Sequence, residues 1–385
     1  MTILKLGMVG GGEGAFIGAI HRIASRIDGK YVLVAGALSS TPDKAILSGQ
    51  ALDLDPERIY PDYQQMAVQE AQREDRIDAV AIVTPNSMHF PIAKAFLEAG
   101  IHVICDKPMT SNLEDAKQLQ KIASRSGGLF VLTHNYTAYP MVRQARQMVQ
   151  QGDLGELRVI QVEYAQDWMS TDAEHTDNKQ AQWRVDPCRS GPAGCLGDIG
   201  THAYNLACFI SQLKLQQVSA ELTTFVQGRK LDDNVQAMLR FDNNVKGMLW
   251  SSQVAPGNEN GLKIRIYGDN GGLEWAQENP NHLLFSPLGH ATQILTRGGN
   301  AYLETGNHLV RTPGGHPEGY LEGFANLYTE AADCMLRIKQ GERLEDVLEG
   351  SMMPDANTGL DGLKFINAVI TSSKQDGHWV SIDEV

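Results

Sequence analysis

The sequence predicts a two-domain α/β protein, with an N-terminal doubly wound parallel sheet followed by an α+β domain built on an open, largely antiparallel sheet. Two patterns predict this fold class. Strand and helix signals alternate over the first third of the chain, whereas after about Gly152 strands follow one another with short turns and few helices between them. The 385 residues suffice for two or three domains with ample cores. We place the domains at residues 1–133 and 134–385.

The first strand leads directly into a glycine-rich turn. Residues 5–9 are expected to be a strand, and apolar residues recur at helical spacing from Phe16 to Ile27 before a second strand over residues 32–37. Glycines in such a turn let the backbone approach a pyrophosphate, and the helix N-terminus stabilises its charge. The pattern indicates a Rossmann-type dinucleotide site more than a structural turn, although either Ala15 or Gly18 must take the third position of G-x-G-x-x-G. The expected cofactor contacts are Gly10, Gly12, Gly14, Ala15 and Phe16.

The second strand is followed by hydroxyl groups where an NAD-specific site usually has an acid. Ser39 and Ser40 can donate hydrogen bonds to a ribose 2′-phosphate, and Lys44 can reach it with a positive charge. NADP is therefore expected to be preferred or at least accepted, with NAD as the alternative. The same stretch is also typical of a helix start, with Thr41 as cap and Pro42 at the first helical position.

Two further strand ends carry polar motifs. A buried strand over residues 78–84 ends in Thr84-Pro85-Asn86 with His89 close behind, and a strand over 102–104 ends at Asp106-Lys107-Pro108. Pro108 cannot donate to a ladder and keeps Lys107 out of the helical region, so an ammonium group is expected at the carboxyl end of a strand, where doubly wound sheets bind ligands. A surface lysine before a turn is the alternative. The residues expected to line the cofactor site here are Thr84, Pro85, Asn86, His89, Asp106 and Lys107.

Local signals place the remaining elements. A helix over residues 91–99 stops at Gly100, Ser111 and Glu114 predict a capping box for the next helix, and a strand over 129–133 follows. Later strands are expected at residues 157–167, 216–225, 234–241, 245–254, 262–267 and 273–277, with helices at 318–339 and 359–373 and a last strand at 379–382. Such an open sheet has one face covered by helices and offers the other to a partner.

Asp198 and His202 form a second chemical pair. They are four residues apart, so a helix would place both on one face. A carboxylate that orients an imidazole and favours the imidazolium makes that histidine a plausible general base. A helix-capping aspartate and a core histidine would give the same spacing.

Together these motifs resemble the glucose-fructose oxidoreductase / inositol dehydrogenase / MocA (Gfo/Idh/MocA) family. The similarity spans essentially the whole chain. It is carried by the glycine turn, Thr84-Pro85-Asn86 with His89, residues 99–103, Asp106-Lys107-Pro108, Trp183-Arg184 and Asp198-x-x-x-His202. The chain departs from the family pattern at Asp106, where glutamate is usual, and at residues 134–139, which lack the arginine often found after that strand.

The resemblance implies an NAD(P)-dependent oxidoreductase whose cofactor lies across the first sheet with its nicotinamide toward the second. The family's catalytic trio would match Lys107, Asp198 and His202. His202 would accept the proton of a secondary hydroxyl, Asp198 would orient it, and Lys107 would stabilise the alkoxide. A sugar, a sugar derivative or a cyclic polyol such as an inositol is the expected substrate. Its expected contacts are Lys107, Tyr136, Trp168, Arg184, Asp198, His202 and His316, although a core or surface role is an open alternative for Tyr136, Trp168 and His316.

Two other functions fit the same resemblance. Some relatives are non-catalytic regulators that sense a dinucleotide, and others are NAD-dependent glycosidases that oxidise and re-reduce a sugar. The intact Lys107, Asp198 and His202 argue against a regulator. Tightly bound cofactor together with glycoside cleavage would favour a glycosidase.

Composition limits the possible partners. The net charge of −13 makes nucleic acid and anionic membranes improbable partners. No apolar run reaches membrane-spanning length, and no basic, signal-like segment begins the chain. The five cysteines include no C-x-x-C pair, so we expect reduced thiols, a cytoplasmic location and no metal site. Residues 235, 237, 239 and 241 are apolar and the intervening positions are not purely charged, so a homodimer or homotetramer through the C-terminal sheet is expected.

Overall fold

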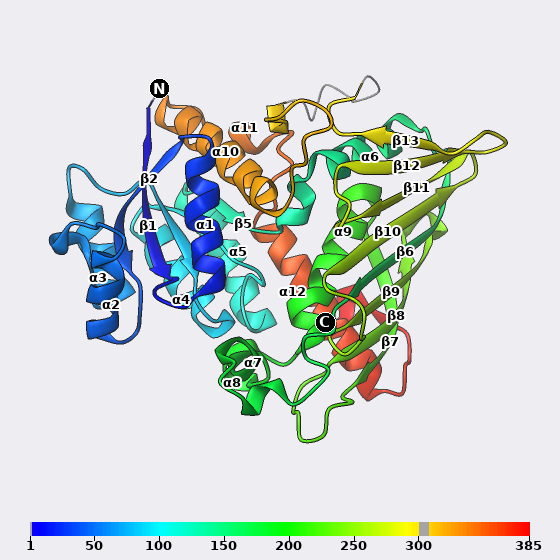
Figure 1. The fold of residues 1–385 in the computed structure, drawn as a ribbon, viewed down its shortest axis with the longest axis horizontal. Coiled ribbons are helices and arrows are strands. Elements are labelled where there is room, and N and C mark those ends of the chain that lie inside the picture. The colour runs from blue at the N-terminus through cyan, green and yellow to red at the C-terminus, as the bar shows by residue number, and fades with distance from the viewer. Residues whose placement is uncertain (1, 300–307) are drawn as a thin grey trace. The chain divides into compact units, whose positions relative to one another are not determined.

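The computed structural model describes residues 2–299 and 308–385, which form two units (Figure 1). The first comprises Met1–Asn135 and Tyr320–Leu360, and the second comprises Tyr136–Gly319 and Asp361–Val385. The observed division differs from the predicted domains because the chain returns to the first unit at Tyr320. Helix α10 (Tyr320–Lys339) packs Phe324 and Tyr328 into the core beside β1 (Leu4–Gly10) and β3 (Ala79–Val83). Hydrophobic periodicity shows that a helix is amphipathic but not which sheet it covers.

The first unit is built on a five-stranded parallel sheet in the order β2-β1-β3-β4-β5, which confirms the predicted doubly wound sheet. Its strands are β1 (Leu4–Gly10), β2 (Tyr31–Ala37), β3 (Ala79–Val83), β4 (His102–Cys105) and β5 (Phe130–Leu132). The chain winds outward from β1 to β2 on one side and to β3 on the other. In doubly wound sheets, ligands bind at the carboxyl ends of the strands where the order reverses, which in this unit are β1 and β3.

Helices surround this parallel sheet. They are α1 (Phe16–Ile27), α2 (Pro42–Gln50), α3 (Tyr63–Gln72), α4 (His89–Glu98), α5 (Leu113–Ser126), α10 and α11 (Leu344–Leu348). Helix α1 packs beside α10, with the His21 ring 5.1 Å from that of Phe324. The predicted capping box was wrong by one residue, because the side chain of Asn112, rather than Ser111, accepts the amide of Asp115 at 2.9 Å.

The second unit contains a nine-stranded sheet in the order β13-β12-β11-β10-β6-β9-β8-β7-β14, and every pairing except β6 with β9 is antiparallel. The predicted largely antiparallel sheet is confirmed. The strands are β6 (Leu157–Ala165), β7 (Leu215–Thr223), β8 (Asn234–Phe241), β9 (Lys246–Ser252), β10 (Gly261–Gly268), β11 (Gly271–Ala276), β12 (His282–Pro287), β13 (Gln293–Thr296) and β14 (Val380–Ser381). Strands β12 and β13 were not predicted.

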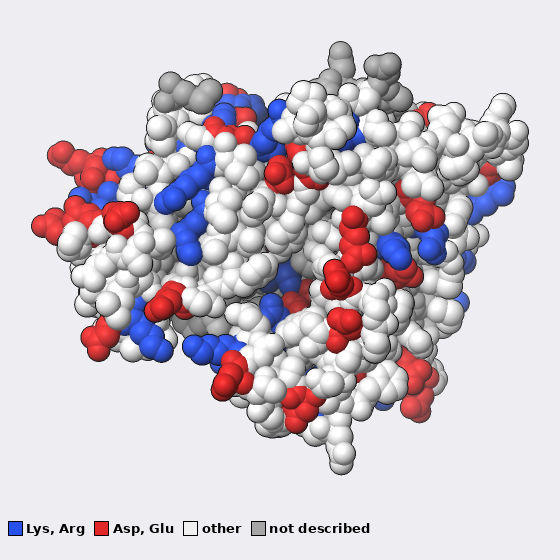
Figure 2. Space-filling model, viewed as in Figure 1, with Lys and Arg blue, Asp and Glu red and all other residues white. Residues whose placement is uncertain are grey.

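Helices α6 (Pro140–Gln151), α9 (Thr201–Ser211) and α12 (Ala356–Lys374) cover one face of this sheet (Figure 1). The short helices α7 (Lys179–Arg184) and α8 (Pro187–Ser190) precede α9. No helix in the described ranges is both long and apolar enough to cross a membrane. Figure 2 shows acidic and basic side chains over the described part of its visible face.

Candidate active site

Most of the glycine turn of the first unit is packed too closely for side chains, with open space at Gly14. Gly10 has φ 81°, and a Cβ atom there would lie 2.9 Å from the carbonyl oxygen of Val83. A Cβ atom on Gly18 would lie 2.4 Å from the Cα of Gly11, so Gly18, and not Ala15, makes the close contact between the helix and the turn. This close approach fixes the start of α1 against the ends of β1 and β3.

Part of the predicted pyrophosphate cradle is already hydrogen-bonded within the protein. The Gly12 amide donates to the Leu38 carbonyl at 3.1 Å, and the Ala15 amide donates to the Gly12 carbonyl at 3.1 Å. Gly14 and Phe16 are exposed at the N-terminus of α1, where the helix dipole favours an anion. The amides of Gly12 and Ala15 are therefore engaged within the protein, and the contacts predicted for the glycine turn stay a prediction.

His89 joins two strand ends. Its Nδ1 lies 2.7 Å from the carbonyl oxygen of Pro108, and its Nε2 lies 2.9 Å from that of Thr84. The ring is fully buried, and burial lowers its pKa. His89 thus holds the loops after β3 and β4 together, which is a structural role beside the predicted cofactor contact. Among the described residues the Thr84 hydroxyl is buried without a hydrogen-bond partner, which fits a group that awaits a ligand.

Asp106 and Lys107 follow β4. The Asp106 carboxylate accepts a hydrogen bond from the Thr133 hydroxyl at 2.9 Å and lies 3.9 Å from Nε2 of His21. Burial acts to raise the pKa of Asp106, but His21 and Lys107 hold it well below the usual range, so the group is ionised. Burial and Lys107 together lower the pKa of His134 to about 3, so that ring is neutral. Lys107 therefore has an anion and a neutral imidazole in its surroundings, and its peptide bond to Pro108 is cis.

In the second unit, Asp198 lies on a π-helical turn, η5 (Leu196–Gly200), which runs directly into α9 with His202. The buried Asp232 carboxylate holds the start of this segment by accepting the amides of Gly194 and Leu196, both at 2.7 Å. Burial raises the pKa of Asp232 to about 6. Sequence spacing predicted an ordinary helix here and missed both the π turn and its anchor.

The His202 ring is held by aromatic side chains. It is 7% exposed and meets the Tyr136 ring in a T-shaped contact with centroids 4.9 Å apart. The Tyr136 and Tyr164 hydroxyls are 2.7 Å apart, and burial raises the pKa of Tyr136. Tyr136, for which a core role was an alternative, is thus brought together with His202, while Tyr164 was not predicted.

Three side-chain amides that sequence reasoning missed connect Asp198 to these tyrosines. Gln253 Nε2 donates to Asp198 Oδ2 at 2.9 Å and lies 3.5 Å from Gln166 Oε1. Gln166 Nε2 donates to Asn260 Oδ1 at 2.9 Å, and that oxygen also accepts the Tyr164 hydroxyl at 2.6 Å. Gln166 and Gln253 follow the parallel strands β6 and β9, and Asn260 precedes β10, which is antiparallel to β6. All three side chains therefore lie at the same end of these neighbouring strands.

Arg184 lies against Asp198 and two tryptophans. Its Nε donates to Asp198 Oδ2 at 3.0 Å, and its guanidinium lies 4.4 Å from the Trp183 ring centroid and 5.7 Å from that of Trp168. Trp168 in turn donates its indole N–H to Gln166 at 2.9 Å. We name the whole set the polar cluster: Tyr136, Tyr164, Gln166, Trp168, Trp183, Arg184, Asp198, His202, Gln253 and Asn260.

His316 is not brought into the polar cluster. It is exposed on the loop over residues 311–318, where its Nδ1 lies 3.3 Å from the Pro313 carbonyl oxygen and its own carbonyl accepts from Arg297. In the described ranges the hydrogen-bond partners of His316 are Arg297, Thr312 and Pro313. No group of three or more His, Cys, Asp or Glu side chains there could hold a metal ion.

Comparison with known proteins assigns the family. Residues 4–134 match the oxidoreductase family with an NAD-binding Rossmann fold, and residues 142–274 match the GFO/IDH/MocA C-terminal domain. The chain belongs to the Gfo/Idh/MocA family. Residues 4–134 of this chain therefore form an NAD-binding domain, as the glycine turn predicted.

Individual relatives resemble this family member over nearly their full length. An uncharacterized oxidoreductase, YfiI of Bacillus subtilis, is 34% identical over 98% of this chain and 96% of its own. The crystal structure of an oxidoreductase from Sinorhizobium meliloti has 50% identity and a TM-score of 0.89, covering 99% of this chain and 100% of its own. An inositol dehydrogenase homolog from Azotobacter vinelandii, solved with NADH and myo-inositol, has 35% identity and a TM-score of 0.92, covering 99% and 98%.

Proposed function

We propose that the protein is an NAD(P)-dependent dehydrogenase that oxidises a secondary hydroxyl of a sugar, a sugar derivative or a cyclic polyol such as an inositol. The observation that carries this proposal is the His202 imidazole, almost buried against Tyr136 and one helical turn after the Asp198 carboxylate. An imidazole that is almost fully shielded from water and lies one helical turn from a carboxylate is suited to accept a proton. The Azotobacter relative that holds NADH and myo-inositol supports the substrate class.

The side chains divide the chemistry between them. His202 accepts the hydroxyl proton, and Asp198 favours the imidazolium that results. Lys107 stabilises the negative charge that develops on the oxygen, with its position fixed by Pro108. The bound nicotinamide supplies the hydride acceptor. Among the cofactor contacts proposed for the first unit are Gly14 and Phe16 at the start of α1 and Thr84 after β3.

The polar cluster favours an uncharged substrate. Its hydrogen-bonding groups are mainly amides, phenols and indoles, which suit hydroxyl groups. Within the cluster the one cation, Arg184, is ion-paired with Asp198 at 3.0 Å. A phosphate or carboxylate substituent on the substrate would be repelled by the Asp198 carboxylate, and the polar cluster offers no second cation to balance the charge of that substituent.

A paired substrate screen tests this function. Inositols and neutral sugars are each assayed beside a phosphorylated or carboxylated counterpart, with NAD and with NADP, by following the absorbance of the reduced nicotinamide. At least one neutral polyol should reduce the cofactor, and its anionic counterpart should react more slowly. Inactivity towards the whole panel would refute the dehydrogenase, and a preference for anions would refute the neutral substrate.

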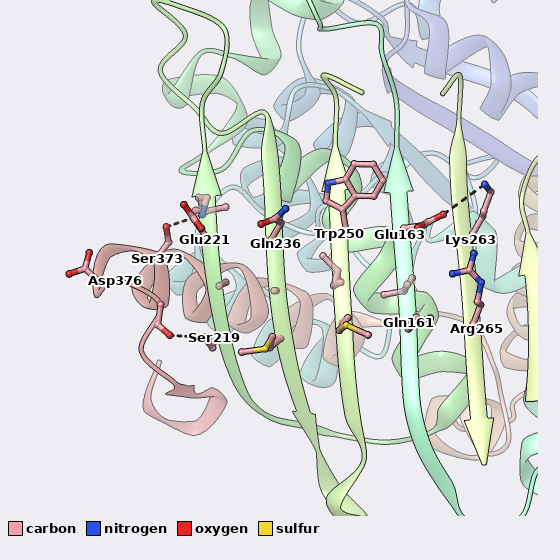
Figure 3. A pocket seen from close by; sticks show the side chains of 18 residues that line it. Gln161, Glu163, Ser219, Glu221, Gln236, Trp250, Lys263, Arg265, Ser373 and Asp376 are labelled. Atoms are coloured by element: carbon pink, nitrogen blue, oxygen red, sulfur yellow. Dashed lines mark hydrogen bonds and ion pairs between the residues drawn. The ribbon is translucent and has the colours of Figure 1, made fainter. Parts of the chain in front are cut away.

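We further propose a cytoplasmic homodimer or homotetramer that assembles through the face of the second sheet opposite α6 and α9, which no described helix covers. Figure 3 shows Glu221, Gln236, Trp250, Glu163 and Lys263 projecting side by side from five adjacent strands of this face. They line an open groove of about 930 Å³. Met238 and Met248, paired across β8 and β9, are 53% and 48% exposed there. All five cysteines are free, as suits a reducing compartment.

A further inference from the structure

We propose that Gln253 is a positioning residue for Asp198, and that it joins this carboxylate to the tyrosine end of the polar cluster through one continuous chain of hydrogen bonds. The inference rests on the proposed function, in which Asp198 and His202 act on the substrate hydroxyl. It adds a residue that neither spacing nor motif indicated, since Gln253 is the first residue after β9 and lies 55 positions from Asp198.

The Asp198 carboxylate is held from two sides. Oδ2 accepts from Arg184 Nε at 3.0 Å and from Gln253 Nε2 at 2.9 Å. The two donors differ in burial. Arg184 ends the six-residue helix α7, and its side chain is 24% exposed. Gln253 is 4% exposed, and its backbone is fixed by the Asp233 carbonyl at 2.9 Å and the Met169 amide at 3.1 Å. Gln253 is therefore the more deeply buried of the two supports.

The hydrogen-bond directions require an amide nitrogen at this position. The Trp168 indole can only donate, so the Gln166 atom that it meets at 2.9 Å must be the amide oxygen. That oxygen faces Gln253, as does the Asp198 carboxylate, and both can only accept. An NH₂ group with two hydrogens satisfies both neighbours, whereas a carboxylate or a methyl group satisfies neither.

The same reasoning runs on to the tyrosines. With its oxygen turned to Trp168, Gln166 must donate to Asn260 Oδ1, which leaves the Asn260 nitrogen to face the Tyr136 hydroxyl at 3.4 Å. Tyr136 is the side chain against which His202 rests. Gln253 thus links the carboxylate and the aromatic support of the imidazole, so both are positioned together.

Variants at position 253 test the proposal on the full-length chain. Gln253→Met keeps the length of the side chain and removes both donors. It should lower kcat about 10- to 100-fold, the range for one lost hydrogen bond to a charged group, while cofactor Kd changes little. In an Asp198→Ala background the same substitution should lower kcat less than about threefold, because the group through which it acts is gone. Gln216→Met, exposed on β7 of the same sheet, is the matched control and should behave as wild type.

Gln253→Glu is a second, nearly isosteric variant with a distinct signature. Its ionised carboxylate would face that of Asp198 and lower kcat at high pH. Once protonated it can donate to Asp198, so the ratio of variant to wild-type kcat should rise as the pH falls from about 9 to about 6. A side chain that merely filled space would give a ratio independent of pH.

Each outcome decides a different question. If wild type oxidises a polyol but Gln253→Met keeps at least half its kcat, or loses the same factor with and without Asp198, the positioning role is wrong. If Gln253→Met does not fold, a pH-independent Gln253→Glu ratio overturns it instead. If wild type oxidises nothing in the panel, the proposed function fails first, and the inference falls with it.

Discussion

At the scale of single residues, Lys107 and His202 differ in their surroundings in a way that suits their proposed roles. Lys107 follows a strand end beside the ionised Asp106, whereas His202 is enclosed by aromatic rings. Lys107→Ala and His202→Ala should each lower turnover by about two to four decades. The first removes the stabilisation of negative charge, and the second removes the group that accepts the proton. Steady-state kinetics on the substrate identified by the screen measures this.

Cofactor affinity provides the internal check, because neither substitution removes a contact of the glycine turn. Kd for the dinucleotide should therefore stay close to the native value. His290→Ala, exposed in the turn between β12 and β13, is the matched histidine control. Near-native turnover in either test variant would disprove the assigned role.

Which site residues could be predicted depends on whether their signal is local. Lys107 with Pro108, and Asp198 with His202, are recognisable because a few adjacent positions fix their relation to a strand end or a helix. Gln166, Gln253 and Asn260 carry no such signal. Only the pairing of β6 with β9 and β10 brings them together from 87 and 94 residues apart. For Arg184 the family resemblance implied a substrate contact, which stays a prediction, and the structure adds an ion pair with Asp198 that sequence reasoning missed.

At the scale of elements, the boundaries of some helices and strands were predictable, whereas their packing partners were not. Strand β8 was predicted at its observed bounds, and α10 within two residues of its start, because their periodicities are clear. That α10 covers the first sheet depends on the buried contacts of His21 with Phe324 and Tyr328, which lie about 300 residues away in sequence. The π turn at Asp198 likewise depends on Asp232, from the loop before β8.

The N-terminus of α2 bears on the choice of cofactor. The Ser39 hydroxyl accepts the Thr41 amide at 3.1 Å, which leaves its proton available for a 2′-phosphate, and Lys44 is exposed one turn on. Lys44→Ala should weaken NADP binding by about one to two decades and leave NAD binding unchanged, because a charge-assisted contact contributes roughly 1.5–3 kcal/mol. Titration of both cofactors measures this, with Lys121→Ala on α5 as control. A native preference for NAD of tenfold or more, unaffected by the substitution, contradicts the prediction.

Strand β4 carries a pH-sensitive contact. His102 Nδ1 accepts the Leu129 amide at 2.9 Å, and burial lowers the pKa of His102 to about 4. The unfolded chain, with an ordinary histidine pKa near 6.5, binds a proton more readily than the folded chain between these values. The contribution of His102 is therefore complete above about pH 6.5 and is lost as the pH falls towards 4, by about 3 kcal/mol.

Replacement of His102 tests this dependence. Asparagine can offer its side-chain oxygen to the Leu129 amide but does not titrate, so His102→Asn should be less sensitive to acid than wild type. Urea unfolding at pH 4.5 and 7.5 gives the difference in unfolding free energy. His378→Asn, exposed after α12, should retain the native dependence. An unchanged pH dependence in His102→Asn would show that this ring does not control it.

At the scale of the whole molecule, the feature that a monomer leaves unexplained is the face of the second sheet that the described helices leave open. Val235, Leu239 and Phe241 are buried on the helix side, while the alternate positions place Met238 outward beside Met248. Both faces of β8 therefore carry apolar side chains, and the alternation in the sequence predicted this. Pairing of two such faces would remove the methionines and the Trp250 ring from water.

We expect light scattering at micromolar concentration to give two or four times the chain mass. Met238→Glu should shift the wild-type oligomer towards smaller species, because it places a charge where apolar surfaces would meet. Val68→Glu, at a position 58% exposed on α3 of the first unit, introduces the same charge away from this face and should leave the mass unchanged. A monomeric wild type, or an oligomer that Met238→Glu does not weaken, would exclude assembly through this sheet face.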